Sequence, residues 1–310
     1  MAEAKLTVVL KADEALKAKL KMFYQDDLCE KTPQYAVFQA KADDCTITLY
    51  QSGKLMFQGK RAEEESKIWT SLGSTELPSK AAHEAGKFCD DTAVGSDEVG
   101  TGDFFGPIVV TAAYVKREQF DFLKSIGVRD SKKVTDEKIC KMAPEIIAQI
   151  PHVTKILSNP NYNQMRDRGI NMNQVKAILH NEVLHQLLKE PQNETKLVVV
   201  DQFEPPAAYY RHLQDEKEVV NEITFMTKAE DQCMAVACGS IISRYVFLGE
   251  MKRLGQELGY PEGLPFGAGA GVDSFGAMLI EDHGEEMLAK VAKMNFANVE
   301  KVRKLYAQTR

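Results

Sequence analysis

Two adjacent carboxylates, Asp97 and Glu98, stand immediately before a glycine-rich turn. Residues 95–107 read Gly-Ser-Asp-Glu-Val-Gly-Thr-Gly-Asp-Phe-Phe-Gly-Pro, and apolar segments flank them on both sides. Adjacent acids repel each other, and placing them near a core is unfavourable unless a cation or hydrogen bonds compensate. Glycines let the backbone come close to a bulky group such as a sugar-phosphate. The segment therefore indicates a divalent-metal site that handles a polyanion.

Two further acidic positions can join this pair. Asp201 directly follows three consecutive valines, and open α/β sheets place their ligands at the carboxyl ends of such buried strands. The other position lies in residues 228–231, Lys-Ala-Glu-Asp. Four carboxylates in one place need shared cations, and oxygen-only ligation favours Mg²⁺ or Mn²⁺ over zinc. Two such ions about 4 Å apart can clamp the attacking water and the leaving oxygen of a phosphodiester hydrolysis.

Each piece alone also has an ordinary structural explanation. An Asp-Glu pair is usually a solvated turn, Asp201 could cap a helix, and the acids of residues 228–231 could complement a helix dipole. The turn Gly100-x-Gly102-x-x-x-Gly106 misses the dinucleotide-binding spacing by one residue, and the chain has no Walker-type loop. The prediction of a metal site therefore rests on the combination of these acids with the glycine turn.

Helices that alternate with apolar strands must position these acids. Ile108–Val115 is a nearly continuous apolar strand, and Lys196–Val200 is a short β-branched strand that ends at Asp201. This alternation predicts an α/β sheet with helices on its faces. Helices are predicted over residues 136–150, 173–188, 232–254 and 295–310.

The sequence pattern of residues 1–75 predicts a separate small α+β domain with an antiparallel sheet. In the predicted strand 45–50, Cys45, Ile47 and Leu49 alternate with polar residues, which is the period of a half-buried strand. Asp13 can cap a helix that follows it. Residues 76–92 lack clear periodicity and are interpreted as a linker, so the larger domain spans 93–310.

Composition limits the class of protein. The chain has 310 residues, of which 44% are hydrophobic and 27% charged, as expected for a soluble globular protein. No signal peptide is recognisable, and no apolar run approaches the ~20 residues of a membrane span. The six cysteines form no Cys-x-x-Cys pair, which favours reduced thiols in a cytoplasmic protein. A net charge of −6 argues against a general polyanion binder, so any nucleic-acid contact must be local.

Five motifs follow one another along the chain, namely residues 95–107, Arg129-Asp-Ser-Lys-Lys133, Val200-Asp-Gln-Phe203, Lys228-Ala-Glu230 and Ser240-Ile-Ile-Ser-Arg244. Together they resemble the type 2 ribonuclease H superfamily, and within it the bacterial ribonuclease HIII branch. Gly-Thr-Gly at 100–102 favours this branch, because ribonuclease HII enzymes carry Gly-Arg-Gly there. The segment from Tyr162 to Asn181 also favours it, as does the N-terminal domain, which in this branch resembles one repeat of the TATA-binding-protein fold.

The resemblance implies an α/β ribonuclease H-like catalytic domain behind a smaller α+β, TATA-binding-protein-like domain. It also implies an endonuclease that cuts the RNA strand of RNA–DNA hybrids to 5′-phosphate and 3′-hydroxyl ends, with two Mg²⁺ or Mn²⁺ ions when substrate is bound. The implied metal ligands are Asp97, Glu98 and Asp201. Counting back from the Ser240 motif identifies Glu230 as the fourth catalytic acid, with Asp231 as the alternative.

Three groups of residues are implied as substrate contacts. The glycine turn would sense 2′-hydroxyl groups, a basic loop would bind phosphate, and the N-terminal sheet would hold the hybrid without reading bases. These groups are Gly100, Thr101 and Gly102; Ser131, Lys132 and Lys133; and Thr46, Thr48 and Tyr50. A packing turn, a solvated loop and a partner-binding or purely stabilising domain are the respective alternatives.

Two rival functions remain open. One is ribonuclease HII-like cleavage at single embedded ribonucleotides, and the other is a non-catalytic hybrid-binding protein. We expect a cytoplasmic monomer that binds nucleic acid, with no membrane contact and no obligate protein partner. The histidines, among them His180 and His185, are predicted to have core or helix-surface roles rather than catalytic ones.

Overall fold

The computed structural model forms two compact units, residues 1–86 and 87–310, and each is described here by itself. The division falls within the predicted linker, most of which lies outside the described residues. The described residues are 7–25, 27–29, 31–42, 44–62, 65–66, 69, 75–76, 91–128, 134–190 and 197–308.

The smaller unit is an antiparallel sheet with the strand order β2-β3-β4-β1-β5, covered on one face by helix α1. Asp13 caps α1 as predicted, since its Oδ1 accepts a hydrogen bond from Leu16 N at 2.8 Å. Strand β5 extends through Glu76, one residue beyond the predicted end of this domain. The element bounds are β1 Thr7–Lys11, α1 Glu14–Phe23, β2 Ala36–Ala42, β3 Cys45–Tyr50, β4 Lys54–Gly59 and β5 Thr75–Glu76.

The alternation predicted for β3 is confirmed. Its odd-numbered side chains are buried against α1, while Thr46 and Tyr50 on the opposite face are partly exposed. Thr48 shares that opposite face but has no accessible surface. Its Oγ1 accepts a hydrogen bond from Gln39 Nε2 at 3.0 Å. Thr48 is therefore buried and hydrogen-bonded to its neighbour in β2.

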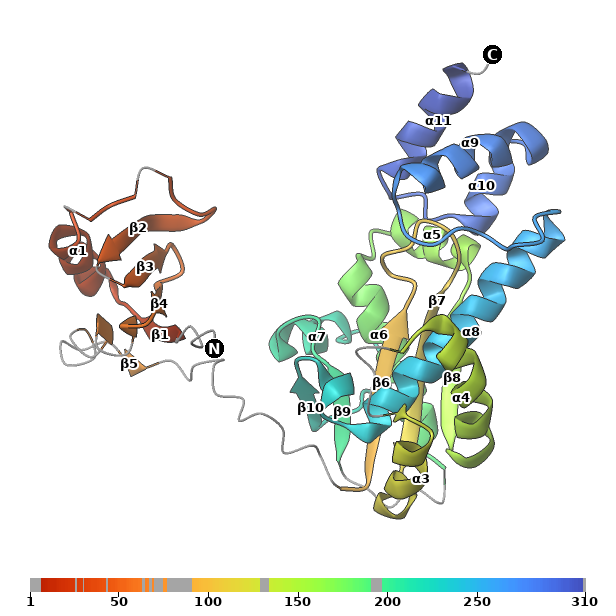
Figure 1. Cartoon of the computed structure of the whole chain (residues 1–310), viewed down its shortest axis with the longest axis horizontal. Helices are drawn as coiled ribbons and strands as arrows, with labels where there is room; N and C mark the ends of the chain where they lie inside the picture. The colour runs from red at the N-terminus through yellow and green to blue at the C-terminus, as the bar shows by residue number, and fades with distance from the viewer. Residues whose placement is uncertain are drawn as a thin grey trace. The chain divides into compact units, whose positions relative to one another are not determined.

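The larger unit is built around a mixed five-stranded sheet in the order β10-β9-β6-β7-β8 (Figure 1). Strands β6, β7 and β8 are antiparallel, whereas β6, β9 and β10 run parallel. The strand bounds are β6 Ala93–Val99, β7 Ile108–Val115, β8 His152–Leu157, β9 Val198–Asp201 and β10 Ile223–Met226. The helix bounds are η1 Arg117–Gln119, α3 Phe120–Ser125, α4 Asp136–Gln149, α5 Asn159–Asp167, α6 Met172–Leu188, α7 Pro206–His212, η3 Ala229–Asp231, α8 Met234–Glu257, α9 Ala270–His283, α10 Glu285–Val291 and α11 Asn298–Gln308.

Helices cover both faces of this sheet, as predicted. Helices α4 and α8 pack on one face and α6 on the other (Figure 1). The start of α8 comes unusually close to β6, because a Cβ on Gly95 would lie 2.4 Å from Val236 N. Within the described part of the chain, α8 is the one helix long and apolar enough to cross a membrane. Its burial against β6 and β7 accounts for that composition.

The C-terminal helices α9, α10 and α11 form a further apolar cluster around the residues that follow the glycine turn. Phe104 and Phe105 are fully buried in it, together with side chains from α8. The predicted final helix is present as α11, with Val299 and Val302 buried. The glycine turn is therefore attached to a packed layer directly after Asp103.

Candidate active site

The register of the sheet places three of the predicted acids on two neighbouring strands. Strands β6 and β9 are parallel, with Ser96 opposite Val200. Asp97 and Asp201 are the next residues on each strand, so they lie at the same level of the sheet. The charges of both Glu98 and Asp201 act on the Asp97 carboxyl. The three carboxylates therefore form one electrostatic group.

Asp97 and Glu98 both lie within β6, where successive side chains point to opposite faces. Asp97 faces α8, since the Ser240 hydroxyl donates to its carboxylate and Ser243 Oγ donates to its carbonyl oxygen at 3.2 Å. Glu98 faces α6, where its contacts with Lys176 and His180 lie. Pleating thus separates two side chains that are adjacent in the sequence.

The Asp97 carboxyl is destabilised in its charged form. Burial raises its pKa above the ordinary range, and the charges of Glu98 and Asp201 raise it further. Hydrogen bonds from Ser240 and from Glu98 N, which lies 2.8 Å from Asp97 Oδ1, act in the opposite direction. A cation at this position would relieve the same repulsion.

Glu98 has the opposite character. Burial favours its neutral form, but the hydrogen bond and charge of His180 and the ammonium of Lys176 outweigh it and hold the pKa of Glu98 below its ordinary value. His180 Nε2 lies 2.9 Å from Glu98 Oε2, and Lys176 Nζ forms an ion pair with Glu98 Oε1. Both oxygens of Glu98 are therefore engaged.

Lys176 and His180 were not identified as site residues from the sequence. They lie one turn apart on α6, inside the Tyr162–Asn181 segment that carries part of the family resemblance, and their Lys-x-x-x-His spacing marks them as neighbours on one helix face. His180 is fully buried, as a core role predicts, but it also contacts a predicted metal ligand. Its second nitrogen, Nδ1, lies 2.8 Å from Ser96 Oγ.

Asp201 is tied to the segment that carries the fourth acid. Asp201 Oδ1 accepts a hydrogen bond from Ala229 N at 2.8 Å. Ala229 opens the 3-10 turn η3, which contains both Glu230 and Asp231 as half-buried residues. Lys228, just before it, has a left-handed backbone with φ of 56°. Both candidates for the fourth acid therefore directly follow the residue whose backbone amide donates to Asp201.

The donor chemistry of this edge suits a hard divalent cation. Carboxylate oxygens are the ligands that Mg²⁺ and Mn²⁺ prefer, and the three acids repel one another without a cation. Among the described residues, no three His, Cys, Asp or Glu side chains converge as a preformed metal site. Both oxygens of Glu98 are directed at Lys176 and His180. An ion would have to compete with Lys176 for this carboxylate.

The three glycines of the turn differ in whether internal packing requires a glycine at their position. Gly100 has φ of +90°, and a Cβ there would lie 2.3 Å from Pro107 O. Gly106 has φ of +81°, and its Cβ would collide with the sulfur of Met251. Gly102 is exposed, its φ lies outside the left-handed region, and a Cβ there would meet nothing within 4 Å. Internal packing therefore explains Gly100 and Gly106 but not Gly102.

A buried lysine that the sequence did not mark holds this turn. Lys293 Nζ donates to Asp103 O at 2.8 Å and to Gly106 O at 2.6 Å. Gly267 N donates to Asp103 Oδ1 at 2.6 Å, which attaches the turn to a second loop. Burial lowers the pKa of Lys293 to about 7, although the Asp103 charge opposes this effect. The turn is thus fixed from distant parts of the chain.

The remaining predicted contacts lie elsewhere. Ser131, Lys132 and Lys133 fall outside the described residues. Thr46 and Tyr50 lie on the face of the smaller sheet opposite α1, where Lys54 Nζ lies 5.7 Å from the centre of the Tyr50 ring. Each of these positions therefore remains a prediction about substrate contact.

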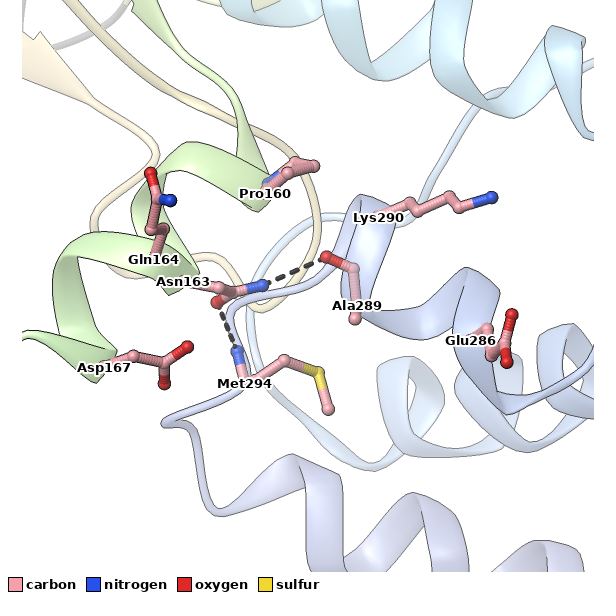
Figure 2. A pocket seen from close by; sticks show the side chains of 8 residues that line it. All are labelled: Pro160, Asn163, Gln164, Asp167, Glu286, Ala289, Lys290 and Met294. Carbon is pink, nitrogen blue, oxygen red and sulfur yellow. Dashed lines mark hydrogen bonds between the residues drawn. The ribbon is translucent and has the colours of Figure 1, made fainter.

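A cavity of about 440 Å³ lies between α5 and α10, and none of the candidate carboxylates lines it (Figure 2). Asn163 lines it, with its Nδ2 donating to Ala289 O and Ala292 O and its Oδ1 accepting from Met294 N. Tyr162, its neighbour, donates to Asn295 Oδ1 at 2.8 Å. These contacts give the Tyr162-Asn163 pair a structural role, which is to join α5 to the C-terminal helices.

Known proteins resemble the chain along both units. A family model described as Ribonuclease HII matches residues 94–299, and one described as a domain of unknown function (DUF3378) matches residues 7–82. The Ribonuclease HIII of Geobacillus sp. (strain WCH70) is 42% identical over 299 residues, covering 96% of this chain and 98% of its own. That of Bacillus licheniformis is 39% identical over 307 residues, covering 96% and 97%. A crystal structure of Bst-RNase HIII in complex with Mn²⁺ superposes with a TM-score of 0.70 at 40% identity, covering 98% of this chain and all of the other.

Proposed function

The chain belongs to the ribonuclease HIII branch of the ribonuclease HII family, as its motifs predicted, and from this premise we propose that it hydrolyses the RNA strand of RNA–DNA hybrids. Its relatives named Ribonuclease HIII match both units over nearly their full length. The products would carry 5′-phosphate and 3′-hydroxyl ends. We place the enzyme in the cytoplasm, as a monomer without an obligate protein partner.

One observation carries the proposal. Asp97 and Asp201 lie at one level of two parallel strands with Glu98 next to Asp97, and an exposed glycine that internal packing does not explain follows on the adjoining turn. A set of mutually repelling carboxylates beside a polyanion is unfavourable for a protein that only binds nucleic acid. The arrangement therefore favours a nuclease over a non-catalytic binder.

The acids would hold the divalent ions. Asp97 and Asp201 are the central ligands in this proposal, and Glu98 and Glu230, or Asp231 in its place, complete the set. We propose two Mg²⁺ or Mn²⁺ ions with substrate, and the Mn²⁺ in the Bst-RNase HIII structure supports this metal class. Bound ions supply water activation and charge neutralisation at the scissile phosphate. The Ser240 hydroxyl and the Ala229 amide orient Asp97 and Asp201.

The glycine turn would distinguish RNA from DNA. Backbone groups of Gly100, Thr101 and Gly102 lie next to the acids in sequence, and the missing Cβ of Gly102 leaves room for a ribose to approach. Lys293 and Gly267 keep the turn in one conformation through Asp103. Ser131, Lys132 and Lys133 are proposed to bind backbone phosphate.

The smaller unit would hold the hybrid with the sheet face opposite α1. We propose residues 1–75, extended through Glu76 by strand β5, as this substrate-binding domain, the residues from there to 92 as a linker and 93–310 as the catalytic domain. Thr46, Tyr50 and Lys54 supply polar and cationic groups on that face. Thr48 has no accessible surface and is hydrogen-bonded to Gln39, so its contribution would be to the order of the face.

The Asp97→Asn substitution tests the proposed nuclease activity. Loss of the central carboxylate should abolish cleavage of an RNA–DNA hybrid in Mg²⁺ or Mn²⁺ while hybrid binding, measured by fluorescence anisotropy, stays largely intact. Cleavage at the wild-type rate would overturn the assignment. Parallel Glu230→Gln and Asp231→Asn variants identify the fourth acid as the one whose loss reduces kcat more.

Substrate choice separates the two nuclease subtypes. A duplex with a single embedded ribonucleotide is compared with one that contains a run of four or more ribonucleotides. We expect efficient cleavage of the longer run, because Thr101 stands where ribonuclease HII enzymes carry arginine. Efficient cleavage of only the single-ribonucleotide duplex would support ribonuclease HII-like activity instead.

A further inference from the structure

A cation from the protein itself balances the charge of Glu98. Lys176 Nζ and Glu98 Oε1 form an ion pair in which the side chains are only 11% and 12% exposed. A charge this deeply buried requires a partner, because desolvation of an isolated charge is strongly unfavourable. Lys176 thus provides Glu98 with the same compensation that a divalent ion would provide.

An aromatic ring fixes the position of the Lys176 ammonium. Its Nζ lies 3.9 Å from the centre of the Phe203 ring, a distance suited to a cation–π interaction. His180 stacks on the same ring, with the ring centres 5.6 Å apart. Because Phe203 follows Asp201 by two residues, the ammonium is linked to the strand end that carries the third acid.

His180 holds the other oxygen of Glu98. Its Nε2 lies 2.9 Å from Glu98 Oε2, and its Nδ1 lies 2.8 Å from Ser96 Oγ. Both ring nitrogens are therefore engaged, and the ring has no exposed surface. Glu98 keeps a hydrogen-bonding partner on this side even if Lys176 is removed.

We propose that Lys176 is a positioning residue that serves as the resident counter-ion of the carboxylate group. The proposal rests on the proposed function only in assigning Glu98 to divalent-ion binding. In the ion-free protein the ammonium compensates Glu98 and stabilises the fold. When a divalent ion binds, the same positive charge opposes it, since like charges repel across a short, partly desolvated distance. Lys176 therefore weakens ion binding while it stabilises the ion-free state.

The Lys176→Met variant separates these two effects. Mn²⁺ binding without nucleic acid, measured by isothermal titration calorimetry, should become about three- to tenfold tighter, because one opposing charge is gone. The melting temperature of the ion-free variant should fall below that of the wild type. This difference should shrink at saturating Mn²⁺, because the ion then compensates Glu98.

Two control variants show whether charge is the cause. Lys176→Arg retains a cation and should keep Mn²⁺ affinity near that of the wild type. Lys155→Met removes a lysine from a surface ion pair with Glu182, whose side chains are 45% and 38% exposed, and should leave Mn²⁺ affinity unchanged.

A packing role for Lys176 gives a different result. In that case Lys176→Met lowers the melting temperature equally with and without Mn²⁺ and binds Mn²⁺ no more tightly, which would overturn the proposal. If the methionine variant does not fold, Lys176→Gln is measured against the same two criteria. Since no measurement here uses substrate, failure of this proposal is distinguishable from failure of the nuclease assignment, which Asp97→Asn tests by cleavage.

Discussion

Asp97 and Glu98 are neighbours in the sequence but face opposite sides of strand β6. Asp97 is directed at α8 and Glu98 at α6, so each acid has its own set of compensating groups. Strand pleating therefore separates the two side chains, but the Glu98 charge still raises the pKa of Asp97. The two acids also differ in pKa, because only Glu98 contacts a buried cation.

Gly102 allows a sharp test at the level of one residue. A Gly102→Ala substitution should leave the melting temperature nearly unchanged, because its Cβ would enter open space at an ordinary φ. Hybrid cleavage should fall about tenfold or more in kcat/KM, equivalent to about 1.4 kcal/mol, if a ribose must approach this backbone. Thermal melting and steady-state kinetics provide the two measurements.

Two matched glycines control this experiment. Gly249 on α8 also has open space and no positive φ, so Gly249→Ala should preserve both stability and activity. Gly100→Ala should lower stability, because φ of +90° and the contact with Pro107 O both oppose a Cβ. Full activity in Gly102→Ala would mean that this glycine is not needed for substrate approach.

Helix α6 and the glycine turn have structural roles that their local sequence patterns do not indicate. Helix α6 covers the sheet and also supplies both partners of Glu98. The turn is short, but Lys293 and Gly267 hold it from segments more than 150 residues away in the chain, at separations of 190 and 164 residues. Its conformation therefore depends on the packing of the C-terminal helices.

The buried lysine of this turn predicts a specific pH dependence. The pKa of Lys293 is about 7 in the folded state against 10.5 for an ordinary lysine. Between these values the unfolded chain binds the extra proton, so the free energy of unfolding rises with pH and becomes flat below about pH 7. A Lys293→Met variant lacks this pH-dependent contribution to the free energy of unfolding. The stability advantage of the wild type should therefore grow from pH 7 to 10, by up to about 4 kcal/mol.

Urea denaturation of the wild type and Lys293→Met at several pH values measures this gap. Lys290→Met on α10 is the control, because Lys290 is exposed and its removal should give no pH-dependent gap. A gap that stays constant from pH 7 to 10 would contradict a buried, proton-releasing Lys293. In that case the lysine contributes only its hydrogen bonds to Asp103 O and Gly106 O.

On the scale of the whole molecule, the chain consists of two units, and the proposed function assigns one nucleic-acid contact surface to each. The larger unit carries the acids and the turn, and the smaller unit carries the sheet face opposite α1 with Thr46, Tyr50 and Lys54. Two linked surfaces can raise affinity beyond either one, because the second contact is intramolecular. Under this proposal an acidic chain would bind a polyanion through local contacts.

Charge removal from the sheet face tests the role of the smaller unit. The double substitution Lys41→Ala and Lys54→Ala should weaken hybrid binding about tenfold and reduce its salt dependence, since two cationic contacts are lost. The value of kcat should stay unchanged, because the acids lie in the other unit. Fluorescence anisotropy over a series of salt concentrations measures both effects.

The matched control removes two lysines from the helix on the opposite face. Lys19→Ala with Lys21→Ala takes away the same charge from α1 and should leave hybrid affinity near the wild-type value. Equal losses in the two double variants would indicate a general charge effect. No loss in either would favour a stabilising or partner-binding domain.

The sequence by itself identified the candidate acids and the glycine turn with its family resemblance. It also predicted the alternation of helices and strands and the division into two units. These features depend on residue type and short spacing, which a single chain displays directly. Only the tertiary structure decided that Lys176 and His180 compensate Glu98, although His180 lies 82 residues from it in the sequence. The tertiary structure likewise decided that Lys293 holds the turn. It also decided that Thr48 is buried and hydrogen-bonded to Gln39. Such contacts arise from long-range packing, in which many alternative partners are equally compatible with the local sequence.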